Sequence, residues 1–294
     1  MRILLTGASG FIGRHLVSRL SSAHELFVLE RDPQRAAQNE TIRVVVMDLA
    51  RSLNVSALPA EIDIIIHLAQ ANVPFPQAAN DLWAVNTSAT QQLLDYGRRA
   101  RARQFVLAST GDVYGRRIGL CEETDPAAPA SYYGLTKRVA EMLAQAYSDY
   151  LRPCIVRLFQ PFGPGQSDRL IPKLADRIRK GQVIRLNKDD RPRMTPIYVD
   201  DVTRAVESAI GASFAGVINI AGDRVVSVRE LAQEIGRALG CEPFFEESGQ
   251  EAADMMGSNE LMKRALGNWP LVSLADGLSR ALEGKEAPEW HTHV

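Results

Sequence analysis

A tyrosine and a lysine four residues apart give this chain its clearest capacity for chemistry. Tyr133 and Lys137 fall within residues 131–150, whose apolar spacing predicts a helix, so both side chains project from one face. An ammonium group beside a phenol favours the phenolate and is expected to lower the tyrosine pKa from about 10 toward neutrality. A phenolate can take a proton from a substrate hydroxyl while a hydride leaves the same carbon. The spacing is equally typical of a surface pair that only stabilises its helix.

A glycine-rich segment near the start of the chain indicates a phosphate site. Residues 6–13 (TGASGFIG) stand between an apolar run and a predicted helix. Gly7, Gly10 and Gly13 would let the backbone approach a pyrophosphate, and the helix start would offer free N–H groups. A tight turn with close helix–sheet packing is the structural alternative.

Charged residues at the ends of the next two strands bear on the choice of dinucleotide. Glu30 can accept hydrogen bonds from both ribose hydroxyls of NAD and would repel a 2′-phosphate, whereas Arg31 has the opposite preference. Both are also compatible with solvated strand ends. Asp48 could bind the adenine amino group or form a turn. The pattern favours NAD over NADP without excluding NADP.

The remaining pattern predicts the scaffold that positions these residues. Short apolar runs alternate with helical spacing, which is typical of a doubly wound parallel α/β sheet of the Rossmann type. The expected strands are 3–5, 26–29, 44–47, 62–66, 105–108, 155–159 and 217–220, and the expected helices are 11–20, 81–101, 131–150 and 227–239.

Proline and glycine in residues 160–166 mark a loop where this alternation weakens. We therefore expect a dinucleotide-binding domain at 1–160 plus about 196–222. Residues 161–195 and 223–294 would form a smaller, mostly helical substrate lobe that covers the carboxyl edge of the sheet. Ser227 and Glu230 have capping-box spacing at the start of one helix of this lobe.

Composition excludes several classes of protein. The 294 residues are 46% hydrophobic with a net charge of -1, so neither a disordered chain nor a basic nucleic-acid binder is expected. Three scattered cysteines and five histidines without metal-ligand spacing predict neither disulfides nor a metal site. No apolar run is long enough to span a membrane. We expect a cytoplasmic protein without a nucleic-acid or membrane partner.

Several segments, in order along the chain, resemble one family. They are similar to an extended short-chain dehydrogenase/reductase of the NAD-dependent epimerase/dehydratase group, which acts on nucleotide sugars. The segments are 6–13 (TGASGFIG), 67–69 (HLA), 86–87 (NT), 109–115 (STGDVYG), 133–137 (YGLTK), 157–159 (RLF), 163–166 (GPGQ) and 198–201 (YVDD).

The resemblance implies roles for the matched residues. Tyr133 would be the general base or acid, and Lys137 would bind the nicotinamide ribose and lower the tyrosine pKa. Thr110 would supply the hydroxyl that holds the substrate oxygen, and Asn86 would steady the lysine. The cofactor would also contact further residues, which are Phe11, Ile12, Leu49, Leu68, Ala69 and Gln70.

Three departures from the family pattern leave the substrate open, and one of them is the absence of the family's usual glycines from residues 187–190. Gln160 stands where the family commonly has a sugar- or diphosphate-binding asparagine. Arg193 is displaced by one position from the family arginine, so it is either a diphosphate ligand or a solvated side chain. Dehydratases carry two acidic residues after the threonine, whereas this chain has Gly111 and Asp112.

With one carboxylate at that position, the resemblance favours a sugar-nucleotide 4-epimerase with a transient 4-keto intermediate. A 4-keto-sugar-nucleotide reductase, a dehydratase or decarboxylase with a role for Asp112, and a non-catalytic NAD(P)-binding regulator are the alternatives. The family also implies a homodimer, with residues 81–101 and 131–150 as the contacting faces.

Overall fold

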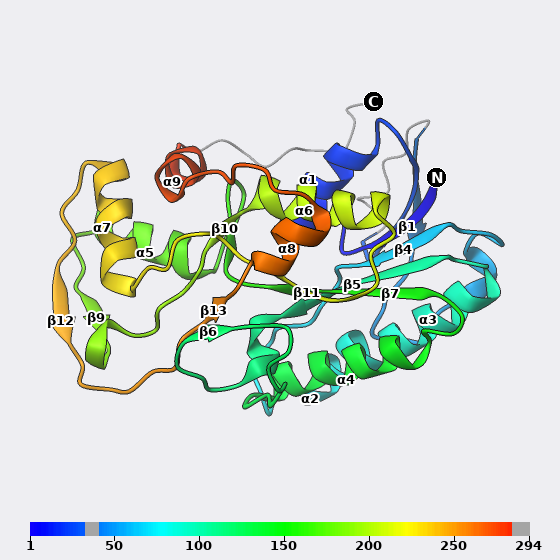
Figure 1. Ribbon diagram of the computed structural model, residues 1–294, viewed down its shortest axis with the longest axis horizontal. Helices are drawn as coiled ribbons and strands as arrows, with labels where there is room; N and C mark the ends of the chain where they lie inside the picture. Colours follow the sequence, from blue (N-terminus) through cyan, green and yellow to red (C-terminus); the bar gives the residue numbers. More distant parts are fainter. Residues whose placement is uncertain (33–40, 284–294) are drawn as a thin grey trace.

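A computed structural model describes residues 1–32 and 41–283 of the chain (Figure 1). The end of the expected lobe, residues 284–294, therefore lies outside the described residues. Within the described part, no helix is both long and apolar enough to cross a membrane.

The core of the molecule is a seven-stranded parallel sheet with the strand order β11-β7-β5-β4-β1-β2-β3. Every strand expected from the sequence is present, and the doubly wound Rossmann-type fold is confirmed. The strands are β1 (Arg2–Thr6), β2 (Glu25–Glu30), β3 (Ile42–Val46), β4 (Ile64–His67), β5 (Gln104–Thr110), β7 (Arg152–Leu158) and β11 (Gly216–Ile220).

Helices cover both faces of the sheet because successive strand residues point to opposite sides. Ile3 and Leu5 pack toward α1 (Phe11–Leu20), α6 (Val199–Gly211) and α8 (Glu260–Leu266). Leu4 between them packs with Leu93 and Leu94 of α3 (Ala89–Arg99) and with residues of α4 (Tyr132–Ala146). Figure 1 shows the two helical layers, with the sheet between them.

The predicted helix at 81–101 is instead three consecutive helical segments. They are α2 (Ala79–Trp83), a π-helical turn (Ala84–Ser88) and α3. Apolar spacing indicates which face of a helix is buried, but it does not reveal a turn that contains one extra residue. The π-helical turn was therefore not predicted.

The smaller lobe, which was expected to bind substrate, lies beyond the carboxyl edge of the sheet (Figure 1). It contains α5 (Leu170–Arg179), α7 (Val228–Leu239) and α9 (Leu274–Leu282), which share one hydrophobic cluster. The predicted capping box of Ser227 and Glu230 is present at the start of α7. Short strand pairs complete this side of the molecule, namely β9 (Ile184–Leu186) with β12 (Phe245–Glu247), β8 (Pro161–Phe162) with β10 (Ile197–Tyr198), and β6 (Leu120–Cys121) with β13 (Met256–Gly257). Among the residues that the structure describes, 3-10 helices occupy Val55–Ala57, Gly111–Tyr114 and Lys188–Asp190.

Part of the expected lobe packs on the sheet instead. Met262 and Leu266 of α8, together with Trp269, belong to the hydrophobic cluster of α1 and α6. The Trp269 indole N–H also donates to Asp201 Oδ1 of α6 (3.1 Å). We propose that residues 260–269 be grouped with the dinucleotide-binding domain.

Candidate active site

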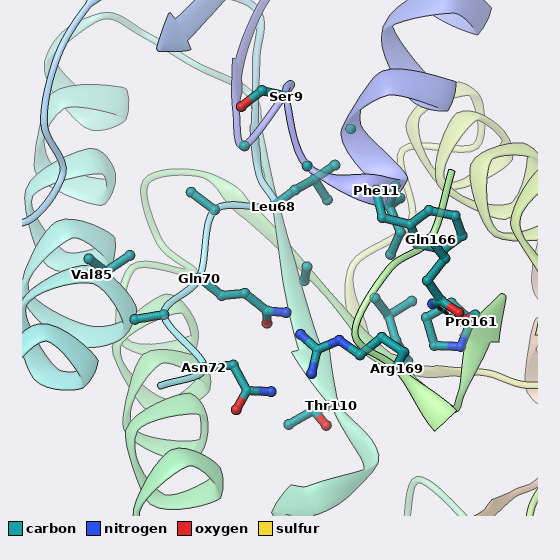
Figure 2. A pocket seen from close by; sticks show the side chains of 18 of the residues that line it. Ser9, Phe11, Leu68, Gln70, Asn72, Val85, Thr110, Pro161, Gln166 and Arg169 are labelled. Carbon is teal, nitrogen blue, oxygen red and sulfur yellow. Dashed lines mark hydrogen bonds between the residues drawn. The ribbon is translucent and has the colours of Figure 1, made fainter. Parts of the chain in front are cut away.

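A cavity of about 970 Å³ opens at the carboxyl edge of the sheet, between the sheet and the lobe. Open α/β folds bind ligands at this edge. The glycine segment 6–13, the ends of β2 to β5 and the lobe loop 160–171 all contribute to the lining, which Figure 2 shows from close by.

The glycine segment forms a turn that excludes side chains. Gly7 has a φ of 74°, and a Cβ there would lie 2.6 Å from the Ala69 nitrogen. A Cβ on Gly13 would lie 2.0 Å from the Gly7 carbonyl oxygen. Helix α1 begins after Gly10, and no side chain caps this end of the helix. Its first N–H groups therefore remain available to a ligand in the cavity. The geometry suits a pyrophosphate.

Glu30 is held in place by the glycine turn. The Ser9 amide donates to Glu30 Oε1 (2.9 Å) and the Ser9 hydroxyl donates to Oε2 (3.0 Å). The carboxylate is 4% exposed and lines the cavity together with Arg31 and Asp48. Each oxygen keeps a lone pair for a ribose hydroxyl. Ser9 was not predicted, although its place inside the glycine segment was a usable signal.

Asp48 forms the turn that was one of the two roles left open for it, and its adenine-binding role stays a prediction. It lines the cavity, and its Oδ1 also accepts the Ala50 amide (3.0 Å) as a turn-forming aspartate does. Leu49 lines the same part of the cavity.

The end of β4 is anchored beneath the cavity by His67. Its Nδ1 shares a hydrogen bond with Thr6 Oγ1 (2.7 Å), and the same oxygen accepts the Ala69 amide (3.2 Å). Burial, followed by the nearby Lys137 charge, lowers the pKa of His67 to about 3, so the ring is neutral. His67 Nε2 has no hydrogen-bond partner in the described part of the chain.

Tyr133 reaches the cavity from the first turn of α4. Ser131 caps this helix by accepting the Gly134 amide (2.9 Å), which fixes where the helix begins. The Tyr133 hydroxyl donates to Gln70 Oε1 (2.7 Å), a residue that also lines the cavity. The phenol and the backbone expected to surround the cofactor therefore meet in one place.

The expectation that Lys137 lowers the pKa of Tyr133 is wrong for the chain alone. Burial raises the pKa of Tyr133 above its ordinary value, and the Asp112 carboxylate raises it further. Arg169 and the Thr110 hydroxyl act in the opposite direction. The phenol is therefore protonated at neutral pH and donates to Gln70.

Lys137 lies below the cavity surface rather than on it. Its side chain is 1% exposed, and the residue is not part of the cavity lining. Burial lowers its pKa to about 8, while the Glu141 carboxylate one helical turn further along opposes this effect. The ammonium is therefore still mostly charged at neutral pH.

Asn86 links the loop after β4 to α4, and the π-turn of residues 84–88 carries it. Its amide accepts the Ala71 N–H (2.8 Å) and donates to the Ala71 carbonyl (2.9 Å) and Thr136 Oγ1 (3.1 Å). It is fully buried and does not line the cavity. Asn86 is thus placed to position the neighbour of Lys137, and it does not reach a substrate.

A buried charge network supports α4 from below. Glu141 accepts two hydrogen bonds from Arg157 (2.9 and 2.7 Å) and one from the Ser109 hydroxyl (2.5 Å). Arg138 donates to the same carboxylate (3.0 Å). This network fixes α4 against β5 and β7, and the sequence patterns did not reveal it.

Thr110 and Asp112 line the cavity near Tyr133. Thr110 Oγ1 also accepts the Asp112 amide (3.2 Å), so it caps the short 3-10 helix that follows β5. Burial raises the pKa of Asp112, and the Thr110 hydroxyl opposes that rise. A Cβ on Gly111 would lie 2.7 Å from the Phe159 ring and 2.8 Å from Met255 Sδ, which leaves no room for a second acidic side chain.

Gln160 lines the cavity as predicted, whereas Arg193 does not. The side chain of Arg193 is exposed, and its backbone pairs with Asp254 and Met255. The structure does not support the predicted ligand role of Arg193. Arg169, at the start of α5, contributes a guanidinium to the cavity instead (Figure 2). Its signal in the sequence was only its proximity to the 160–166 loop.

A glycine turn at the edge of a parallel sheet binds dinucleotides, and a tyrosine in the same cavity can move the proton of a hydroxyl whose carbon loses a hydride. These features place the protein in the class of extended short-chain dehydrogenases/reductases.

Comparison with known proteins narrows this class. The profile of the NAD dependent epimerase/dehydratase family matches residues 3–221, and the chain belongs to that family of enzymes. A probable UDP-glucuronate 4-epimerase of Rhizobium meliloti (strain 1021) is 26% identical, over 96% of this chain and 96% of the relative. A dTDP-glucose 4,6-dehydratase of Streptomyces niveus is 28% identical, over 96% and 92%.

A solved structure shares the same fold throughout. The UDP-glucuronic acid 4-epimerase from Bacillus cereus, in complex with UDP-glucuronic acid and NAD, superposes with a TM-score of 0.87 and 25% identity. The match covers 97% of this chain and 98% of that protein.

Proposed function

We propose that the chain is a sugar-nucleotide 4-epimerase that uses a resident NAD. The observation that carries this proposal is the convergence of Thr110, Tyr133 and the glycine segment on one cavity, with the buried Lys137 one helical turn after Tyr133 on α4. An epimerase needs these groups and a cofactor that is reduced and reoxidised in place.

The residues would divide the work as follows. The Tyr133 phenol first loses its own proton to solvent, and the phenolate then takes the proton of the sugar 4-hydroxyl while Thr110 holds the oxygen. NAD, when bound, supplies a hydride acceptor and donor. After the 4-keto sugar turns, Tyr133 returns the proton to the oxygen on the other face. Lys137 follows Thr136, which Asn86 binds, and places a buried positive charge one helical turn from Tyr133.

The choice of NAD rests on Glu30. A carboxylate held by Ser9 through both oxygens cannot easily turn away from the ribose, and it repels a 2′-phosphate. The solved relative from Bacillus cereus holds NAD. The repulsion between Glu30 and a 2′-phosphate also disfavours a reductase that prefers NADPH. A non-catalytic regulator is disfavoured because Thr110, Tyr133 and Lys137 are all present.

The choice of epimerisation over dehydration rests on Gly111. The 4,6-dehydratases use a pair of acids after the threonine, and the packing of Phe159 and Met255 against Gly111 leaves no space for the first one. Asp112 supports one second candidate, a decarboxylase or dehydratase that works with a single acid, because its carboxyl group faces the cavity beside Tyr133.

The test is to incubate the purified protein, with its bound nucleotide identified, with UDP-glucuronate and UDP-glucose and to follow the sugars by proton NMR. Conversion to the 4-epimer without net formation of reduced nicotinamide is expected. Loss of carbon dioxide or formation of a 4-keto-6-deoxy product would identify the second candidate. Stoichiometric consumption of NADPH by a 4-keto sugar would identify a reductase.

A further inference from the structure

Three side chains at the start of α1 face the lobe. Phe11, Arg14 and His15 are spaced i, i+3 and i+4, so they lie on one face of the helix. Phe11 packs against the hydrophobic cluster of α5, α7 and α9, and its ring meets the His15 ring edge-on at a centroid distance of 5.7 Å. The helix that begins at the glycine segment therefore carries a contact surface for the lobe.

The two polar members of this surface bind the backbone of the lobe loop. The Arg14 guanidinium donates to the Gly165 carbonyl oxygen (2.9 Å). His15 Nε2 lies 3.1 Å from the Pro164 carbonyl oxygen, and because a carbonyl can only accept, this nitrogen carries the hydrogen. Two consecutive carbonyl oxygens of the loop are thus bound by two consecutive residues of α1.

The loop has a shape that presents these oxygens to α1 and also forms a wall of the cavity. Gly165 has a φ of 75°, and the Gln166 side chain donates back to the Pro161 carbonyl oxygen (2.7 Å). Gly165 and Gln166 line the same cavity as the glycine segment. Figure 2 shows Phe11, Gln166 and Pro161 on the same side of this cavity. The loop therefore lies beside the place where the pyrophosphate of a dinucleotide would bind.

We propose that Arg14 and His15 form a clamp that holds the lobe loop against the start of α1 and thereby slows the release of NAD. This inference rests on the proposed function, because an epimerase must keep the same NAD through oxidation and reduction. His15 is buried and is not part of the cavity lining. It is therefore a positioning residue, which acts on NAD only through the loop.

The experiment measures how fast NAD leaves the holoenzyme after dilution, by rapid gel filtration at intervals and chromatographic assay of the retained nucleotide. His15→Phe keeps an aromatic ring beside Phe11 but removes the hydrogen bond to the loop. It should release NAD about 3- to 10-fold faster, as expected for the loss of one net hydrogen bond. His15→Gln places an amide N–H near the position of Nε2 and should restore slow release.

Arg14→Met tests the other half of the clamp, and the double variant Arg14→Met/His15→Phe should release NAD about 10- to 100-fold faster than wild type. Because Arg14 also lines the cavity, His15→Phe is the decisive variant. Arg19→Met is the matched control, because Arg19 lies on the same helix but pairs with Glu207 of α6 (2.5 Å). Its release of NAD should stay within about twofold of wild type.

Equal release rates in wild type and His15→Phe would overturn the clamp and leave epimerisation as proposed. Faster release that His15→Gln does not restore would also overturn it, because the effect would then come from packing rather than from the hydrogen bond. Slow release by wild type and faster release by His15→Phe, without epimerisation of any sugar, would support the clamp and contradict the proposed function.

Discussion

At the scale of single residues, Lys137 occupies a position that is costly for folding. Its ammonium is buried, and its pKa falls to about 8 from an ordinary value of 10.5. Because the folded state disfavours the charged form, the free energy of unfolding is reduced at every pH below about 8. The penalty fades as the pH rises toward 10.5, where the unfolded lysine also loses its proton.

We therefore predict that Lys137→Met stabilises the protein while it abolishes activity. The gain in unfolding free energy should be about 1–4 kcal/mol at pH 7 and should vanish near pH 10.5. Glu141 keeps Arg157 and Arg138 as partners in this variant, so no buried carboxylate is left unpaired. Urea denaturation at a series of pH values measures the effect.

Lys180→Met, on the exposed surface of α5, is the control and should change stability by less than about 0.5 kcal/mol. If Lys137→Met were clearly less stable than wild type at pH 7, the buried ammonium would be a stabilising group and the pH argument would be wrong.

At the scale of elements, the sequence predicted the sheet and the glycine turn well because local patterns determine them. Apolar runs located seven strands, and the strand–glycine–helix order located the phosphate turn. The site was harder where it depends on tertiary contacts. The Ser109–Glu141–Arg157 network joins three elements, and the orientation of Arg169 depends on how the lobe that contains α5 is placed beyond the carboxyl edge of the sheet.

The same dependence on tertiary contacts applies to two further residues. Of the two roles left open for Arg193, the structure fits the solvated side chain, because its backbone pairs with the Asp254 segment and its side chain is exposed outside the cavity lining. The pKa of Tyr133 was inferred from the distance along one helix, whereas burial and Asp112 from another element determine its direction.

The contact between α4 and β7 gives the element-scale prediction. Glu141→Gln should lower the free energy of unfolding by about 3–5 kcal/mol, because it leaves the buried Arg157 guanidinium without its counter-charge. Arg138→Gln removes a partner of the same carboxylate, but Arg138 is partly exposed, so its loss should cost less than about 1 kcal/mol. Chemical denaturation measures both losses of unfolding free energy. Equal losses in Glu141→Gln and Arg138→Gln would contradict the prediction that the buried Arg157 pair contributes more than the partly exposed Arg138 pair.

At the scale of the whole molecule, we retain the expectation of a homodimer as a prediction. Leu135 and Met142 are seven residues apart on α4 and are 43% and 55% exposed, so they lie on one outward face. Trp83 at the end of α2 is 43% exposed in the same helical layer. Apolar side chains gathered on one exposed layer are typical of a subunit contact.

The double variant Leu135→Glu/Met142→Glu should therefore run as a monomer in light-scattering chromatography at concentrations where the wild type is a dimer. Ile118→Glu is the control, because Ile118 is 73% exposed on a loop and is not part of α2, α3 or α4. A wild-type protein that is monomeric at micromolar concentration, or a double variant that still dimerises, would contradict the prediction.

The most direct test of the central claim is the rate of sugar 4-epimerisation by Tyr133→Phe, measured by NMR on protein whose NAD content has been determined. If Tyr133 moves the proton of the 4-hydroxyl, the variant should retain its fold and its NAD and lose about 10²- to 10⁴-fold in turnover. A variant with bound NAD and a near-normal rate would show that another group is the base.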